Sequence, residues 1–107
     1  MSLTVSIENG KTVLIKIKGR FDFDVHKEFR DAYENASVSV SDPKYVVDLM
    51  ETEYMDSSAL GMLLLLRDHA GSDRSRVSIV NCDKVTKEVL DIANFDKLFM
   101  VESKDDH

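Results

Sequence analysis

The chain has 107 residues, of which 43% are hydrophobic and 32% are charged, as is ordinary for a globular protein. This length favours one domain with a real core. We therefore expect a single domain over residues 1–107, with a polar end at 103–107 that frays. The net charge of −6 argues against nucleic-acid binding, because nucleic-acid phosphates would be repelled.

The cysteine content and the apolar runs exclude further classes of protein. Cys82 is the only cysteine, so the chain has neither a disulfide framework nor a paired-thiol metal site. The first residues lack the basic and long apolar segments of a leader peptide. The longest apolar run, 59–66, is less than half a membrane span. These features predict a cytoplasmic protein that does not act on membranes.

The first element of the chain is a predicted hairpin. Apolar and polar residues alternate over 3–8 and again over 13–18, the period of a half-buried strand. Asn9 and Gly10 lie between them and favour a tight turn, because both residues accept positive φ. The sequence therefore predicts an antiparallel pair of strands over about residues 3–18.

A helix, a loop and a third strand follow. Apolar spacing predicts the helix over 25–36, after Asp22 or Asp24, either of which can cap it. Residues 37–43 have the composition of a loop. Residues 45–49 are apolar at every position except Asp48, which is typical of a strand covered on both faces.

The second half of the chain continues the alternation. We expect a helix over 57–70 that ends at Gly71, a strand over 77–80, a helix over 85–93 and a final strand over 98–101. The order predicts an α/β fold with a mixed, mostly parallel sheet of four or five strands, an N-terminal hairpin and three helices.

Polar residues follow three of the predicted strands. Asp22 comes after the second strand, Ser57 and Ser58 after the third, and Asn81 and Cys82 after the fourth. In such sheets, ligand and partner sites lie at the carboxyl ends of the strands. We therefore expect these side chains to meet at one edge of the sheet.

The segment 55–66 is the most informative part of the chain. Asp56, Ser57 and Ser58 precede eight residues without a polar side chain. Aspartate and serine are preferred helix caps, so a purely structural role is the simple alternative. A helix N-terminus also carries unpaired N–H groups and about half a positive charge, so it accommodates a dianion. A phosphate here would turn an apolar surface into a charged one.

The helix that begins there is apolar nearly all round. A helix against one side of a sheet needs only one apolar stripe. Its second apolar face is either covered by a neighbouring helix or docks onto another protein, and the sequence leaves both open. Helical spacing groups Leu60, Leu63, Leu64 and Arg67 on one face, and directs Met62, Leu65, Leu66 and His69 elsewhere.

The sequence predicts no enzyme and no cofactor. A nucleophilic Ser57 or Ser58 would need a histidine base. His69 lies roughly 16 Å along the helix, too far to reach Ser58. His26 could come near Asp22, but the chain has no Gly-x-Ser-x-Gly elbow and no glycine-rich phosphate loop.

A metal site and a reactive thiol are also disfavoured. Asp22, Asp24 and Asp56 could together ligate a hard cation, but capping and turn roles are more common for such residues. We therefore predict no metal site. Cys82 fits a buried structural cysteine better than a reactive thiol.

Four segments share a pattern with a known family. Residues 19–22 match its Gly-x-[Leu/Phe]-Asp step, and 46–49 match its apolar third strand. Residues 55–61 match its Asp-Ser-[Ser/Thr]-Gly-[Leu/Ile]-Gly signature, except that Ala59 replaces the first glycine. Residues 84–99 match its closing helix and Leu-Phe end. With these segments the chain resembles the STAS family, specifically the single-domain anti-sigma factor antagonists, or anti-anti-sigma factors.

The resemblance implies a phosphorylation switch without catalytic activity. In such proteins a partner serine kinase, often the anti-sigma factor itself, phosphorylates the hydroxyl residue two positions after the signature aspartate. That position is Ser58, with Ser57 as the second choice. The unphosphorylated form binds the partner, and a metal-dependent serine phosphatase of the PP2C type restores it. Some relatives regulate biofilm or secretion programmes instead of a sigma factor.

The expected partner surface surrounds the start of the serine-led helix, in a monomer or weak dimer. Two alternatives remain open: a structural STAS subunit of a signalling scaffold, and a small-nucleotide-binding module. The surface comprises Asp22, Asp24, Met55, Asp56, Ser57, Ser58, Ala59, Met62 and Leu65.

Overall fold

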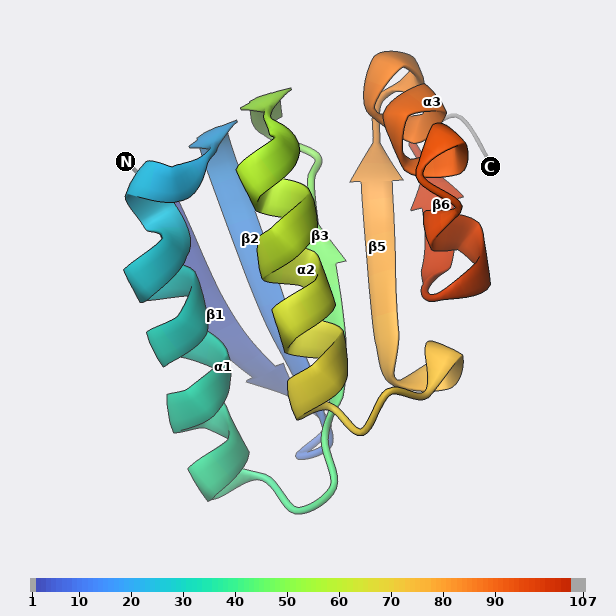
Figure 1. Ribbon diagram of the computed structural model, residues 1–107. Coiled ribbons are helices and arrows are strands. Elements are labelled where there is room, and N and C mark those ends of the chain that lie inside the picture. The colour runs from blue at the N-terminus through green and yellow to red at the C-terminus, as the bar shows by residue number, and fades with distance from the viewer. Residues whose placement is uncertain (1, 105–107) are drawn as a thin grey trace.

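The computed structural model describes residues 2–104 as one sheet with helices packed on it. Figure 1 shows α1, α2 and α3 on the same face of the sheet. Short 3₁₀ turns precede α1 and β5 and follow α3. The elements are β1 Ser2–Glu8, β2 Thr12–Phe21, α1 His26–Ser39, β3 Lys44–Asp48, β4 Thr52–Met55, α2 Ser57–His69, β5 Val77–Cys82, α3 Lys84–Ile92 and β6 Met100–Ser103.

The sheet has the predicted mixed topology. Its order is β1-β2-β3-β5-β6, with β1 antiparallel to β2 and the following pairs parallel. The α/β fold, the N-terminal hairpin and the mostly parallel sheet are confirmed. Within residues 2–104 the sheet has six strands, because β4 adds a short parallel pairing to the end of β2. The sequence analysis missed β4, whose four residues carry no apolar alternation.

The predicted hairpin turn is confirmed. Asn9 and Gly10 have φ values of 55° and 66°, and the Lys11 N–H donates to the Glu8 carbonyl at 3.1 Å. Both turn residues therefore have the positive φ that this kind of turn requires.

Burial explains two of the boundaries that the sequence misplaced. Helix α1 continues three residues into the predicted loop 37–43, to Ser39, since Ala36 and Val40 are buried at its end. The last strand begins at Met100, after the fully buried Phe99. Of the predicted frayed end, Ser103 is the buried end of β6 and the Lys104 N–H donates to the Cys82 carbonyl at 3.0 Å, whereas 105–107 lie outside the described residues.

The sheet is covered on one face only. Along β2 and β3, Ile15 and Val47 are fully buried beneath the helices, whereas Leu14 and Val46 on the opposite face are half-buried. The prediction that residues 45–49 are covered on both faces was therefore wrong. Consecutive valines at 46 and 47 supply one residue to each face, since strand side chains alternate.

Helix α2 packs one apolar stripe and leaves another open. Its buried residues are Ala59, Met62, Leu63 and Leu66, at the spacing of a single helix face. The grouping of faces made from the sequence was wrong, because in an almost continuous apolar run the periodicity does not mark the buried side. Leu64 and Leu65 are 41% and 61% exposed.

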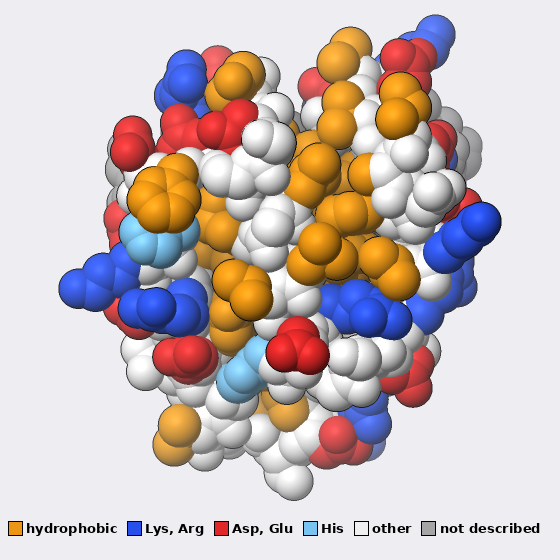
Figure 2. Space-filling view, in the orientation of Figure 1, with side chains coloured by type: hydrophobic (Ala, Val, Ile, Leu, Met, Phe, Trp, Pro, Cys, Tyr) orange, Lys and Arg blue, Asp and Glu red, His pale blue; other side chains and the backbone are white. Residues whose placement is uncertain are grey.

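Exposed apolar side chains gather around the centre of the helical face. Figure 2 shows hydrophobic side chains clustered over α2 and α3. Helix α1 packs beside α2. It does not cover the outer side of α2, so of the two possibilities that the sequence left open, the structure favours an apolar face available for docking. We call the exposed residues Leu64, Leu65, Val85, Val89 and Ile92 the apolar patch.

Candidate functional site

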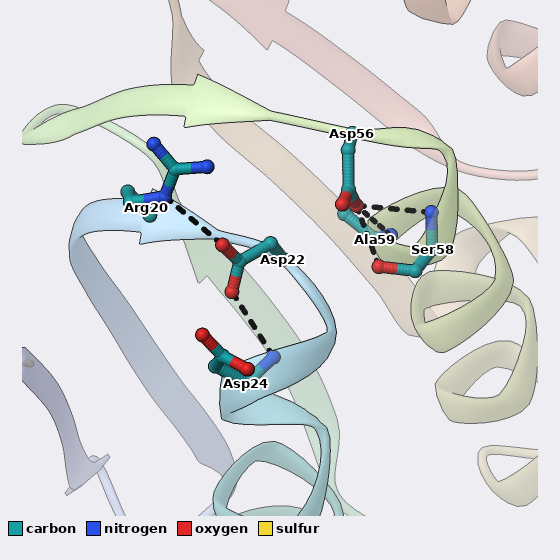
Figure 3. A network of polar contacts seen from close by, with 6 residues as sticks. All are labelled: Arg20, Asp22, Asp24, Asp56, Ser58 and Ala59. Carbon is teal, nitrogen blue, oxygen red and sulfur yellow. Dashed lines mark hydrogen bonds and ion pairs between the residues drawn. The ribbon is translucent and has the colours of Figure 1, made fainter.

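The candidate site forms where the end of β2 meets the start of α2. The pairing of Phe21 with Met55 holds β2 and β4 side by side, and the Asp56 N–H donates to the Phe21 carbonyl at 3.4 Å. Each strand then passes directly into an aspartate-capped helical turn, at Asp22 and at Asp56. Figure 3 shows the two capping loops facing each other. This explains why carboxylates far apart in sequence meet at one edge of the sheet.

The pairing of β2 with β4 is irregular just before the first loop. The register shifts after Gly19, where Glu53 is an extra residue in β4, so that Arg20 pairs with Tyr54. Gly19 has a φ of +85°, a value that glycine adopts without strain, and its N–H donates to the Glu51 carbonyl at 2.9 Å. The shift brings Arg20 beside Tyr54 at the end of the two strands.

Asp56 is the N-cap of α2 and also the partner of Ser58. Its Oδ1 accepts the N–H groups of Ser58 at 3.0 Å and Ala59 at 3.2 Å, and the Ser58 hydroxyl donates to the same oxygen at 2.5 Å. The Ser58 hydroxyl is the main cause that lowers the pKa of Asp56. The two backbone N–H groups and the charge of Arg20 act in the same direction, while partial desolvation opposes them. Asp56 is therefore a carboxylate that orients the Ser58 hydroxyl.

The two serines occupy different environments. Ser57 is exposed, and it precedes the capped N–H groups. Ser58 is half-buried, and Figure 3 shows its hydroxyl pointing toward the loop that carries Asp22. The Ser58 hydroxyl donates a hydrogen bond to the Asp56 carboxylate.

The second capping loop carries an ion pair. Arg20 Nε donates to Asp22 Oδ2 at 3.0 Å, and the Asp24 N–H donates to Asp22 Oδ1 at 3.0 Å. The Arg20 guanidinium also lies over the Tyr54 ring, 4.5 Å from its centroid. The hydrogen bond to Asp22 is the main cause that raises the pKa of Arg20, so the guanidinium stays charged.

The other predicted partner-binding residues differ in their exposure. Met55 is half-buried and Leu65 is exposed, so both can present atoms to a partner. Ala59 and Met62 pack into the core, with 0% and 7% exposure, and leave little side chain at the surface. Helical periodicity could have distinguished the buried positions from the exposed ones. It did not do so because the apolar run is continuous.

The residues after the fourth strand do not join this site. Asn81 donates from Nδ2 to Asp48 Oδ1 at 3.0 Å, and Cys82 is fully buried. The expectation that they meet the serines was therefore wrong, while burial of the thiol is confirmed. Both belong to β5, which is longer than predicted, so their backbone is already committed to the sheet.

Arg20 and Tyr54 are the residues of this site that the sequence analysis missed. Arg20 lies in the Gly-x-Phe-Asp step at the variable position, where no pattern constrains it. Tyr54 lies in β4, which was not predicted, and its ring is exposed in the structure. An aromatic residue close to the Asp-Ser-Ser segment was the signal in the sequence that could have identified it. Finding them required the β2–β4 pairing, which brings the two side chains together.

The two histidines that the structure describes, His26 and His69, make contacts with aromatic residues. The His26 ring stacks on Phe23 with centroids 4.0 Å apart, and its Nδ1 lies 2.8 Å from the Phe23 carbonyl oxygen. His69 packs against Tyr33, at 4.9 Å between centroids. Neither contact provides Ser58 with the base that nucleophilic catalysis needs.

Residues 2–104 contain neither a candidate metal site nor a candidate membrane-spanning helix. Across this part of the chain, no group of three or more histidine, cysteine, aspartate and glutamate side chains is placed to hold a metal ion. Over the same residues, no helix has the length and apolar character needed to cross a membrane.

Known proteins share both the sequence pattern and the fold. Residues 6–102 match the family described as "Mlab, STAS domain". A STAS-domain containing protein of Pseudomonas aeruginosa (strain UCBPP-PA14) is 50% identical over 93 residues, which cover 87% of this chain and 90% of that protein.

Two solved structures illustrate the shared fold. An anti-sigma factor antagonist from Mycobacterium paratuberculosis has a TM-score of 0.78 at 19% identity, over 94% of this chain and 84% of that chain. The Bacillus cell fate determinant SpoIIAA in its phosphorylated form has a TM-score of 0.71 at 18% identity, over 94% of this chain and 90% of that chain. The family match over most of the sequence, together with the half-identical relative, shows that this chain belongs to the STAS family.

Proposed function

We propose that this protein is a phosphorylation-switched binding module of the anti-sigma factor antagonist kind. Its unphosphorylated form binds a partner serine kinase, an anti-sigma factor or a related regulator. Phosphorylation of Ser58 by that kinase abolishes binding, and a PP2C-type serine phosphatase restores it. The observation that carries the proposal is the Ser58 hydroxyl, oriented by Asp56 at 2.5 Å at the N-terminus of a helix with exposed leucines.

In this scheme the partner enzymes carry out both reactions, and this chain is their substrate. The γ-phosphoryl group of ATP, held by the kinase, passes to Ser58 Oγ, the hydroxyl proton leaves, and ADP is released. Asp56 accepts the hydroxyl hydrogen bond and so fixes the direction of Oγ before transfer. The phosphatase uses water to return the hydroxyl and release inorganic phosphate. Among proteins with this fold, SpoIIAA has a phosphorylated form, which supports phosphorylation as the covalent change.

The surface around Ser58 supports protein docking. A groove beside the start of α2 is lined by Tyr54, Met55, Val85 and Val89 together with polar residues. The apolar patch continues from it over α2 and α3 (Figure 2). Apolar area of this kind supplies binding free energy, and the phosphate controls access to it.

The magnitudes are sufficient for a switch. A phosphoserine carries about −1.5 to −2 charges at neutral pH. Changing a complex from mostly bound to mostly free requires about 5.5 kcal/mol. Like charges brought together in an interface cost several kcal/mol, and the bulk of the phosphate adds steric exclusion. Asp56 already makes this surface acidic. A partner element that packs tightly here would therefore meet the charge of the phosphate together with that of Asp56.

The test compares matched variants at the two serines. We expect Ser58→Ala to bind the cognate serine kinase or anti-sigma protein like the parent, and Ser58→Asp to bind at least about 100-fold more weakly, as a shift of about 3 kcal/mol implies. Ser57→Ala and Ser57→Asp are the controls, and both should bind like the parent. Equal binding by Ser58→Asp and the parent, measured by titration calorimetry, would overturn the proposal.

A further inference from the structure

Arg20 lies close to the segment that carries Asp56 and Ser58, because the next residue of β2, Phe21, pairs with Met55 at the end of β4. The charge of Arg20 contributes to the lowered pKa of Asp56, whose Oδ1 accepts the Ser58 hydroxyl at 2.5 Å. Figure 3 shows Arg20 above the Asp22 loop and the Ser58 hydroxyl pointing toward that loop from the other side. The gap between β2 and α2 therefore has a guanidinium on one side and the proposed phosphate position on the other.

Other charges lie close to Arg20 and Ser58. Lys18 of β2 lines the same hollow as Arg20, Asp22 and Asp24. Asp22 and Asp24 lie on the turn after β2 with their carboxylates on the Arg20 side, and Asp56 lies at the start of α2. A phosphate on Ser58 would add nearly two negative charges beside these carboxylates. The helix N-terminus offsets only part of that repulsion, by up to about 2 kcal/mol. A nearby cation with freedom to move would offset more.

Arg20 has that freedom. Its side chain is 67% exposed, and it forms an ion pair with Asp22 and lies over the face of the Tyr54 ring. Exposed ion pairs are worth little, with a median of about 0 to 1 kcal/mol, so giving one up is cheap. A guanidinium can also bind phosphate through two parallel hydrogen bonds. The contact with Asp22 uses the Nε–H group of Arg20.

We propose that Arg20 is the intramolecular ligand of the Ser58 phosphate: on phosphorylation it leaves Asp22 and the Tyr54 ring and pairs with the phosphate oxygens. Asp22 keeps the Asp24 N–H, so its turn stays capped. The exchange uncovers the Tyr54 face and moves a positive charge across the docking surface. Phosphorylation then remodels the surface as well as charging it. This inference rests on the proposed function only for the position of the ester.

The test installs phosphoserine at position 58 during synthesis, so no kinase is needed. The titration of the phosphate is followed by ³¹P NMR in the full chain and in its Arg20→Gln and Lys18→Gln variants. Both substitutions remove one positive charge from exposed positions of β2, which makes Lys18→Gln the matched control. We expect Arg20→Gln to raise the second pKa of the phosphoserine by about half a unit or more, because a paired cation favours the dianion. Lys18→Gln should leave it unchanged.

A second measurement reports the movement directly. In the phosphorylated chain, the Arg20 Nε–H resonance should shift as the phosphate titrates, and in the unmodified chain it should stay constant over the same pH range. Equal phosphate pKa values in the parent and Arg20→Gln, or equal shifts in the two variants, would overturn the inference.

The outcomes separate this inference from the proposed function. If Arg20→Gln changes nothing while phosphorylation still abolishes partner binding, the contact is wrong and the switch stands. If the pKa shift is present but partner binding ignores the phosphate, the contact stands and the switch is wrong.

Discussion

Asp56 links the stability of α2 to the chemistry of Ser58. It caps the helix through two backbone N–H groups and holds the Ser58 hydroxyl with the same oxygen. Capping alone would explain a preference for aspartate or asparagine at this position. The hydroxyl bond adds a reason for a carboxylate, because an ionised acceptor makes a stronger hydrogen bond.

The lowered pKa of Asp56 predicts a particular pH dependence. The native pKa is below that of the unfolded chain, so the ionised form stabilises the fold above about pH 4, the unfolded value for aspartate. This contribution is lost as the pH falls through the native pKa. Asp56→Asn keeps a capping oxygen but cannot titrate. We therefore expect the stability of the parent relative to Asp56→Asn to decrease below about pH 4.

Urea unfolding of the two proteins from pH 7 to pH 2 measures this difference. The test depends on how the difference in unfolding free energy changes with pH. Its size at neutral pH is less informative, since asparagine is itself a good cap. A difference that stays constant throughout this range would show that the Asp56 bonds do not favour the charged form.

At the scale of elements, α2 serves both the core and the surface. Its buried stripe fixes the helix on the sheet, while Leu64 and Leu65 remain open beside the serines. Gly61 lies on the exposed side within the helix, and a Cβ added there would meet no atom within 4 Å. A glycine inside a helix is destabilising, so packing does not explain its presence. The proposed docking surface would explain it, since a partner could approach the backbone closely at a glycine.

Gly61→Ala should therefore have opposite effects on folding and binding. The substitution should stabilise the fold by about 0.5–1 kcal/mol, which raises the melting temperature by roughly 4 °C. Partner affinity should fall, because the added methyl group lies at the proposed contact. Asn35→Ala, on an exposed position of α1, is the control and should stabilise without affecting affinity.

Thermal unfolding and calorimetric titration of these two variants give the comparison. Unchanged affinity in Gly61→Ala would remove this side of α2 from the docking surface, and a loss of stability would contradict the open space found around Gly61.

Local signals in the sequence predicted the elements, and long-range pairing decided the rest. The Asn9–Gly10 turn and the aspartate before the serines each act through their own backbone, so both were predictable. Strand β4 exists because the end of β2 supplies its partner, and its own four residues carry no strand pattern. The contact of Arg20 with Tyr54 comes from the same long-range pairing and was likewise not predictable from local sequence.

At the scale of the whole molecule, the site is built so that the fold can survive its modification. Ser58 lies at the rim of the sheet and above the core, and the start of α2 tolerates negative charge. The buried residues below it, such as Ala59 and Leu63, do not contact solvent. We therefore expect a phosphate on Ser58 to change the surface without displacing the core.

The phosphorylated chain should remain folded. We expect its melting temperature to lie within about 5 °C of the unmodified value, which corresponds to about 1 kcal/mol for a domain of this size. Amide NMR signals should change around β4, the start of α2 and the Asp22 loop, and stay constant in α1 and β6. Global loss of dispersed signals would mean that phosphate acts by unfolding the domain and not by blocking a contact.

The most direct test of the central claim is peptide mass spectrometry of the protein isolated from its native cells across growth conditions. The account predicts a phosphate on Ser58 in part of the material, retained in the Ser57→Ala variant and lost in Ser58→Ala. Phosphate on Ser57 alone, or none on either serine under any condition, would contradict it.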